Sequence, residues 1–338
     1  MKQLFQSDLT KTLLYFTLTL IAAAAIAPWP YNLGKMISEV GEVRATSAEA
    51  QGITGWFDRA EFAHFFLISL LGCALLLAGP FICWMRFGST ADSSPVRPWS
   101  LRLPQHALND TGQPLARNPR RVFDWTTGFL LAGSLLALMN WLFLLTGWFA
   151  FNHPVDWLPA LMRALICAIV LAVMIEWVFR GVFLGVLLRS LRPSLAIVLA
   201  SVIFAGIHFL FPPEHFQLKD AGEADAGFRF IGAVTNHLFA HPGYCFGFAS
   251  LLFAGLILTY TRYRTASLSL AIGLQSGWMF VFFLSHEIIT FTNTQLSKIE
   301  FIIGPDRRSG LIPLCILIAT GLLVHVFLQI STRNDKPT

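Results

Sequence analysis

Long apolar runs separated by short polar connections dominate this chain of 338 residues. A helix needs about 20 mostly apolar residues to cross the roughly 30 Å hydrocarbon core of a bilayer. Runs of about that length are found at 12–30, 61–86, 126–150, 158–188, 194–211, 244–261, 265–285 and 311–330. The pattern predicts an all-α, polytopic membrane protein with about eight transmembrane helices.

The composition excludes an ordinary soluble domain. Hydrophobic residues make up 55% of the chain, charged residues only 13%, and the mean hydropathy is +0.62, whereas soluble domains carry about 25% charged residues. With the N-terminus inside, fourteen of the 24 Lys and Arg residues fall on the cytoplasmic side and eight outside. This asymmetry predicts that both termini are cytoplasmic. The net charge of +5 then indicates contact with anionic membrane lipids, and nothing points to nucleic acid.

One polar stretch divides the chain. Residues 87–124 carry five prolines and five arginines and are predicted to form a cytoplasmic linker. The linker separates an N-terminal two-helix membrane part, 1–86, from a six-helix core, 125–330, followed by a cytoplasmic tail, 331–338. The first helix follows Lys11 and contains Ala22–Ala25, so a cleaved secretory signal remains an alternative for it.

No metal centre is predicted. The five cysteines lie singly in apolar helices without a CxxC pair, which is typical of small buried side chains. The expected outer loop, 212–243, holds several acids and histidines, but not at the spacing of metal ligands. We therefore expect a solvated loop and no cofactor.

Glu176 and Arg180 stand four residues apart inside an otherwise apolar run. A charge near the centre of a membrane helix costs about 2.5–3.5 kcal/mol, so such charges are retained where they pair or face a wet cavity. At 1.5 Å per residue, Glu176 lies about 20 Å, His208 about 21 Å and Gln275 about 15 Å from the cytoplasmic boundary. Polar groups from three helices at similar depths predict one buried polar site.

Residue chemistry alone leaves two interpretations of these groups. In the first they are structural: Glu176 and Arg180 form an intrahelical pair, His208 donates to a carbonyl, and Gln275 hydrogen-bonds between helices. In the second, a desolvated carboxylate and imidazole activate water inside the membrane. The Gly181/Gly185 and Gly273/Gly277 pairs favour close helix approach in either case.

Three segments resemble the motifs of the CAAX-protease and bacteriocin-processing (CPBP, or Abi) intramembrane peptidases. Residues 175–181 are similar to the first motif, EExxxRG, and residues 204–208 match the second, FxxxH. Residues 264–279 resemble the phrase around the third motif, HxxxN. The resemblance covers roughly 125–285 and implies a CAAX-protease-like helical core. It also implies an endopeptidase that acts on prenylated CAAX-type proteins or leader-bearing peptides in the membrane.

The chain departs from these motifs at three positions. Ile175 replaces the leading glutamate, Gln275 the third-motif histidine, and Met279 its asparagine. The resemblance then implies that His208 acts as general base, that Glu176 and Arg180 order the site, and that Gln275 steadies the oxyanion.

Other properties follow from the resemblance or stay open. Phe204 and Trp278 are expected to contact the substrate, and a multi-pass protein of a bacterial plasma membrane is expected. One Glu and one His fall short of the three protein ligands of a usual catalytic zinc site. The alternatives are a catalytically inactive relative that binds a membrane protein or lipid-like chain, and a transporter component, for which paired broken helices are not visible.

Overall fold

The computed structural model describes residues 8–44, 54–55, 57–87, 120–152, 156–208, 218–240, 242–292, 302–304 and 310–334. By internal contacts the chain divides into two units. The first comprises Met1–Asp92 and Ile207–His241, and the second Ser93–Gly206 and Pro242–Thr338. Each is described by itself.

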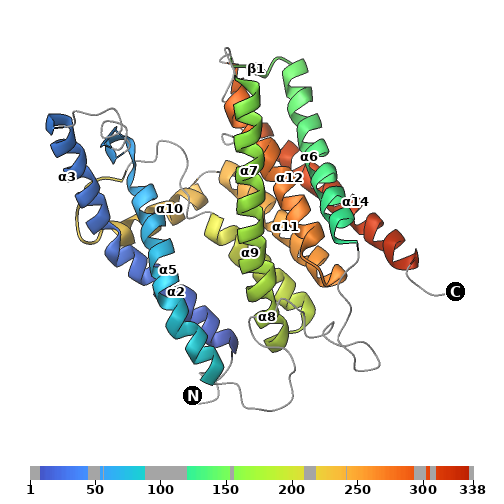
Figure 1. The fold of residues 1–338 in the computed structure, drawn as a ribbon, viewed down its shortest axis with the longest axis horizontal. Helices are drawn as coiled ribbons and strands as arrows, with labels where there is room; N and C mark the ends of the chain where they lie inside the picture. The colour runs from blue at the N-terminus through green and yellow to red at the C-terminus, as the bar shows by residue number, and fades with distance from the viewer. Residues whose placement is uncertain are drawn as a thin grey trace. The chain divides into compact units, whose positions relative to one another are not determined.

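The first unit consists of helices around one apolar cluster. Its helices are α2 (Asp8–Ile26), α3 (Pro28–Arg44), α5 (Phe62–Phe87) and α10 (Ala226–Ala240). Helix α2 packs along α5, and α10 packs against α2, as Figure 1 shows. Phe66 and Phe230 meet at the centre of the cluster, with ring centroids 4.7 Å apart. This packing explains why 207–241 group with the N-terminal helices, which the sequence-based division into 1–86 and 125–330 did not anticipate.

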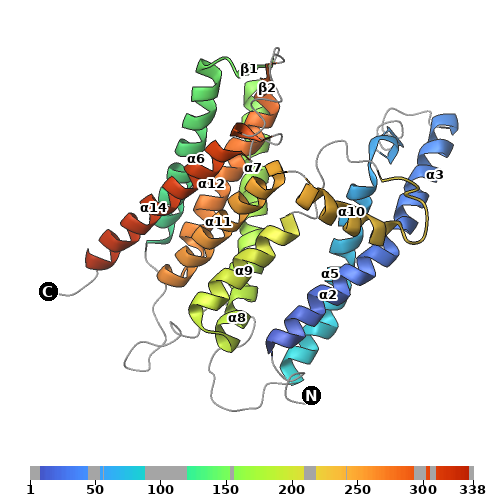
Figure 2. The same ribbon diagram turned by 180° about the vertical axis from the view of Figure 1, so that it is seen from behind.

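The second unit is a helical core in which α12 is central. Its elements are α6 (Arg121–Leu145), β1 (Phe149–Phe151), α7 (Trp157–Glu176), the π-helix η2 (Trp177–Phe183), α8 (Leu184–Ser190), α9 (Pro193–His208), α11 (Pro242–Thr265), α12 (Ser269–Ile288), β2 (Ile289–Phe291) and α14 (Leu311–Asn334). The final two residues of α9 fall in the first unit. Helix α12 packs on α6, α7 and α11, and α14 covers α11 and α6 (Figure 2). The antiparallel pair β1–β2 closes one end of α12.

Glycines let α6 and α12 approach to backbone contact. A Cβ atom on Gly273 would collide with the Trp125 carbonyl oxygen, and one on Gly277 with that of Phe129. From the other side, a Cβ on Gly128 would lie 2.7 Å from the Leu270 oxygen. The close approach predicted for Gly273 and Gly277 is therefore real, and its partner is α6.

The helical membrane fold is confirmed. In the described part of the chain, six helices are long and apolar enough to span a membrane, and they fall on six of the eight predicted runs. Helices α9 and α12 occupy the remaining two. Large apolar side chains are exposed along these helices, for example Leu158 at 70% and Leu322 at 65%, as expected for surfaces that face lipid.

Several predicted boundaries are wrong. The run 126–150 begins earlier, at Arg121, and its last residues belong to β1 rather than to the helix. The segment 31–60, between the first two predicted runs, contains most of α3, and the expected loop 212–243 contains α10. Neither helix is a long uninterrupted apolar run, so a search for membrane spans misses both.

Candidate functional site

A stripe of alanines leads along α7 to Glu176. The residues at four-residue spacing, Ala160, Ala164, Ala168, Ala172 and Glu176, are all at most 2% exposed. Residues four apart lie on one helix face, and this face packs against α12. Small side chains allow two backbones to approach closely. Glu176 is thus the last member of a helix–helix contact and is directed into protein.

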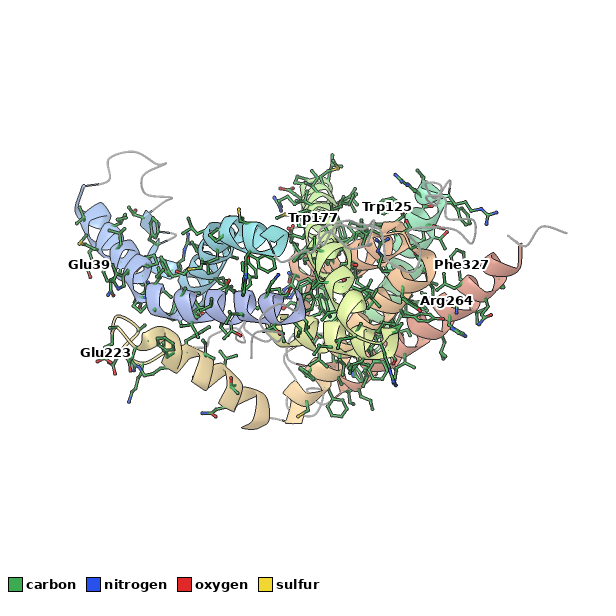
Figure 3. All side chains as sticks on the ribbon, turned by 90° about the horizontal axis from the view of Figure 1, so that it is seen from below. Glu39, Trp125, Trp177, Glu223, Arg264 and Phe327 are labelled. Atoms are coloured by element: carbon green, nitrogen blue, oxygen red, sulfur yellow. The ribbon has the colours of Figure 1, made fainter. Side chains whose placement is uncertain are left out.

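The α-helical pattern changes directly after Glu176. Residues Trp177–Phe183 form a π-helical segment, a rare conformation that occurs frequently at functional sites. It carries Arg180, which is 1% exposed and whose Nη1 donates a 2.8 Å hydrogen bond to Glu176 Oε1. Trp177, by contrast, is 53% exposed, and Figure 3 labels it on this helix. The predicted intrahelical pair is present, fully removed from solvent.

Two further helices enclose the Arg180 guanidinium. The Phe204 ring of α9 lies under it, 4.1 Å from ring centroid to Cζ, and stacks edge-on against Phe179 at 5.3 Å. From α11, the Gly255 carbonyl oxygen lies 3.5 Å from Arg180 Nη2. A Cβ on Gly255 would come within 3.1 Å of Ser201, so glycine lets α11 approach α9 here. A cation held between a carboxylate and an aromatic face is stabilised by both.

Gln275 lies at nearly the same level as Glu176. The start of α7 is beside the end of α12, because Arg163 pairs with Glu287 at 2.8 Å, so the two helices run antiparallel. Glu176 is thirteen residues after Arg163, and Gln275 is twelve residues before Glu287. Equal rise per residue therefore brings both to one level of the α7–α12 pair. Gln275 is 7% exposed.

The remaining third-motif positions are also on α12. Trp278 packs against the apolar cluster around Leu258 and Leu274, and its buried Nε1 has no hydrogen-bond partner among the described residues. Met279 is half-buried. Contact of Trp278 or Phe204 with a substrate stays a prediction.

His208 is the last residue of α9, one turn beyond Phe204, and is half-buried. The chain divides between Gly206 and Ile207. The structure therefore brings together Glu176, Arg180 and Phe204, and sets Gln275 at their level in the same unit, while His208 belongs by contacts to the other unit. Its role as a base stays a prediction.

An exposed ion pair marks the opposite end of the α7–α12 contact. Arg163 Nη2 and Nε bind the two carboxylate oxygens of Glu287 at 2.8 and 3.3 Å. These hydrogen bonds lower the pKa of Glu287 from its ordinary value. The position of the pair marks the register in which Gln275 lies level with Glu176.

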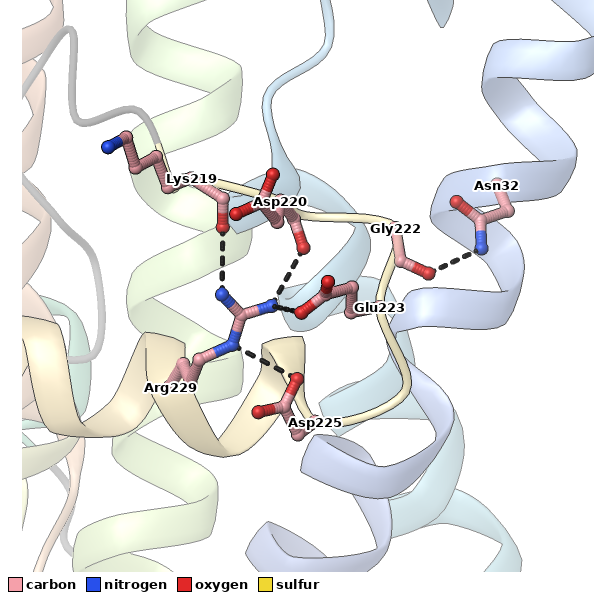
Figure 4. Close-up of polar contacts among 7 residues, drawn as sticks. All are labelled: Asn32, Lys219, Asp220, Gly222, Glu223, Asp225 and Arg229. Atoms are coloured by element: carbon pink, nitrogen blue, oxygen red, sulfur yellow. Dashed lines mark hydrogen bonds and ion pairs between the residues drawn. The ribbon is translucent and has the colours of Figure 1, made fainter.

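The described part of the outer loop is organised by Arg229 (Figure 4). Its guanidinium donates to the carbonyls of Lys219 and Asp220 and to the carboxylates of Glu223 and Asp225, at 2.8–3.2 Å. The four oxygen acceptors that converge here thus already bind the guanidinium cation of Arg229. Within the described ranges, no group of three His, Cys, Asp or Glu side chains could hold a metal ion. His215 and His241 lie outside the described residues.

Sequence reasoning missed two contributors to this site. The alanines of α7 could have been found, because their four-residue repeat is in phase with Glu176. The Gly255 carbonyl carries no such signal, since a single glycine in an apolar helix has many explanations.

Comparison with known proteins finds one family similarity, over the segment that holds this site. A protein-family model described as type II CAAX prenyl endopeptidase Rce1-like matches residues 156–281, the segment from the start of α7 into α12. No curated protein and no solved structure matches the chain. The matched segment contains Glu176, Arg180, Phe204, His208 and Gln275, so over these residues the chain is similar to the CAAX protease (CPBP) family of membrane proteins.

Proposed function

We propose that this protein is an intramembrane endopeptidase that hydrolyses peptide bonds of prenylated CAAX-type proteins or leader-bearing peptides. The observation that carries the proposal is the fully buried Glu176–Arg180 pair, in which Glu176 ends α7 at the level of Gln275 and Arg180 lies in the π-helical segment that follows. Such a pair costs desolvation energy, and a helix bundle without a polar site has no need of it. The family match supports the same reaction class.

The residues have distinct roles in this proposal. His208 takes a proton from the attacking water, which requires approach to hydrogen-bond distance in the substrate complex. Glu176, which is hydrogen-bonded to Arg180, keeps the polar side chains of the site in a fixed arrangement. The Gln275 amide donates to the oxyanion that forms when water adds to the scissile carbonyl, a contribution of about 2.7–4 kcal/mol for a well-placed donor.

The three replaced positions favour a second candidate, a catalytically inactive relative that binds a membrane protein or lipid-like chain. Ile175 cannot accept a proton, and Met279 cannot donate a hydrogen bond. Glu176 does not substitute for residue 175, because neighbouring helix positions point about 100° apart; Glu176 is fully buried while Ile175 is half-buried.

Proteolysis in reconstituted vesicles distinguishes the two candidates. The purified chain is incubated with a prenylated CAAX reporter and a panel of leader peptides, beside Glu176→Ala, His208→Ala and the triple variant Ile175→Glu, Gln275→His, Met279→Asn. Trp177→Ala, on the exposed face, is the matched control for Glu176→Ala. We expect cleavage by the parent and the control, and none by the two alanine variants. Cleavage by the triple variant alone identifies an inactive relative.

The cellular setting is part of the proposal. The charge asymmetry of the loops supports cytoplasmic termini, and the family resemblance supports a multi-pass protein of a bacterial plasma membrane. The substrate is then a peptide or lipidated protein that approaches Glu176 from within the bilayer.

A further inference from the structure

A hydrogen-bonded polar pair connects α11 and α14 at their exposed surface. The Tyr260 hydroxyl of α11 and Nδ1 of His325 on α14 are 3.0 Å apart. The apolar spans of these helices end at Thr265 and Ile330, so each partner lies five residues, about 7–8 Å, inside the end of its span. His325 is nevertheless exposed. Ionisable side chains within membrane spans almost always face the bundle interior or a wet cavity, so an exposed imidazole at this depth points to contact with a polar group of the lipid.

A cation lies between this pair and the end of α11. Arg264, one residue before the end of the helix, is exposed, and its Cζ lies 5.9 Å from the centroid of the Tyr260 ring. Arg264 has no acidic partner among the described residues, and neither α11 nor α14 contains Asp or Glu. Figure 3 labels Arg264, together with Phe327 of α14. The two helices therefore leave this positive charge without an anion.

The exposed face of α14 changes from polar to apolar with depth. Gln329, one turn closer to the end of the helix than His325, has its Nε2 3.4 Å from His325 Nε2. In the opposite direction, Leu322 and Ile318 stand three and seven residues before His325 and so lie on the same helix face. They are 65% and 40% exposed. From the membrane surface inward, the order is thus a cation, a hydrogen-bonding pair and an apolar stripe.

This order matches the chemistry of a phospholipid, whose phosphate lies at the membrane surface, above the glycerol esters and the acyl chains. Basic residues near the membrane surface favour lipids with a net negative charge. We propose that Arg264, Tyr260 and His325 form a binding site for one anionic phospholipid. The phosphate binds the Arg264 guanidinium, the ester oxygens meet the Tyr260–His325 pair, and an acyl chain lies along Leu322 and Ile318. The site does not depend on the proposed peptidase activity.

The lipid preference of the detergent-purified full chain tests the proposal without any substitution. Native mass spectrometry measures the dissociation constant of the first bound lipid for dioleoylphosphatidylglycerol and for dioleoylphosphatidylcholine, which share their acyl chains. We expect the anionic lipid to bind at least about fivefold more tightly, the equivalent of about 1 kcal/mol for one basic residue. This advantage should shrink as the salt concentration rises. Equal affinities, or a preference that salt does not change, contradict the proposal.

Substitutions then locate the site. We expect Arg264→Gln to weaken binding of phosphatidylglycerol about fivefold and to leave phosphatidylcholine unchanged. Arg192→Gln is the matched control, because it removes the same charge from another exposed position on the predicted cytoplasmic side. Both side chains are exposed, so neither substitution disturbs packing. Equal weakening by the two substitutions would indicate a general attraction by surface charge, and this result contradicts a site at Arg264.

The polar pair is tested by Tyr260→Phe, which keeps the ring beside Arg264 and removes the hydroxyl. The variant should bind phosphatidylglycerol more weakly than the parent and should retain the dependence on salt. Binding as tight as that of the parent contradicts a role for the Tyr260–His325 pair.

Inorganic phosphate distinguishes a lipid from a free anion. We expect phosphate at the concentration of the lipid to leave phosphatidylglycerol bound, because phosphate makes no contact with Leu322 and Ile318. Displacement of the lipid under these conditions identifies a site for a free anion and contradicts the proposal.

Discussion

Arg180 and Arg163 lie on the same continuous helical segment, and each pairs with a glutamate at 2.8 Å, but in opposite surroundings. The Arg180–Glu176 pair is at most 1% exposed, whereas the Arg163 side chain is 65% exposed. Removing one partner of a buried pair leaves an uncompensated charge and costs about 3–5 kcal/mol. Water and counter-ions screen an exposed pair. The contribution of each arginine to the free energy of unfolding should therefore depend on whether its ion pair is buried, and not on the presence of the pair alone.

We therefore predict that Arg180→Ala lowers the free energy of unfolding by about 3–5 kcal/mol, and that Arg163→Ala changes it little. Denaturant unfolding in detergent, followed by far-UV circular dichroism, measures both. Comparable small effects of the two substitutions would show that water reaches Glu176 in the folded protein.

The Glu287–Arg163 pair predicts a pH dependence. The pKa of Glu287 is lowered in the folded protein from the ordinary value of 4.5 by its hydrogen bond to Arg163. A carboxyl group with a lowered pKa stabilises the folded state above the ordinary value, and this contribution is lost as pH falls through the folded pKa.

Because the pair is exposed and screened, Glu287→Gln should lower the melting temperature only slightly at neutral pH, and it should converge with the parent in acid well below pH 4.5. The exposed Glu39 has no ion pair in the described structure, so Glu39→Gln serves as the control and should follow the parent throughout. A difference between Glu287→Gln and the parent that persists in acid would assign the effect to something other than the carboxylate charge.

At the level of elements, the contact of α6 with α12 depends on glycine. A side chain on Gly277 would meet the carbonyl of Phe129, which belongs to backbone and cannot move aside. Overpacking of this kind costs about 1–3 kcal/mol. Gly206 on α9 has nothing within 4 Å of its added Cβ, and alanine is intrinsically better than glycine in a helix by about 1 kcal/mol.

The two glycines should thus respond with opposite signs. Gly277→Ala is expected to lower the melting temperature, while Gly206→Ala leaves it unchanged or raises it. Since α12 carries Gln275, Gly277→Ala should also reduce any cleavage activity. A neutral Gly277→Ala would mean that α6 can move away from α12 without loss of packing.

The elements also show what the sequence can and cannot predict. Apolar length located a helix at each of the eight predicted runs, six of them long and apolar enough to span a membrane in the described part of the chain. The i, i+4 spacing located the Glu176–Arg180 pair. Both predictions depend on local physical constraints. Arg262 is one of the fourteen cations counted on the cytoplasmic side, yet its side chain is only 2% exposed, because the positive-inside rule counts charge along the chain and does not predict burial. Tertiary contacts determine the π-helical segment after Glu176 and the three-residue strands. The spacing of apolar residues in the sequence therefore does not predict them.

At the scale of the whole molecule, the sidedness predicted from the charges of the chain can be tested at exposed positions that the structure describes. Single cysteines are introduced at Glu223, in the predicted outer loop, and at Arg264, in the last turn of α11, in a background without the five native cysteines. With both termini inside, a membrane-impermeant maleimide should label Glu223→Cys in intact cells, and Arg264→Cys only after lysis. The cysteine-free parent is the control for background labelling. The reverse pattern would invert the topology, and the substrate segment cleaved at the level of Glu176 would then have to enter from the opposite leaflet.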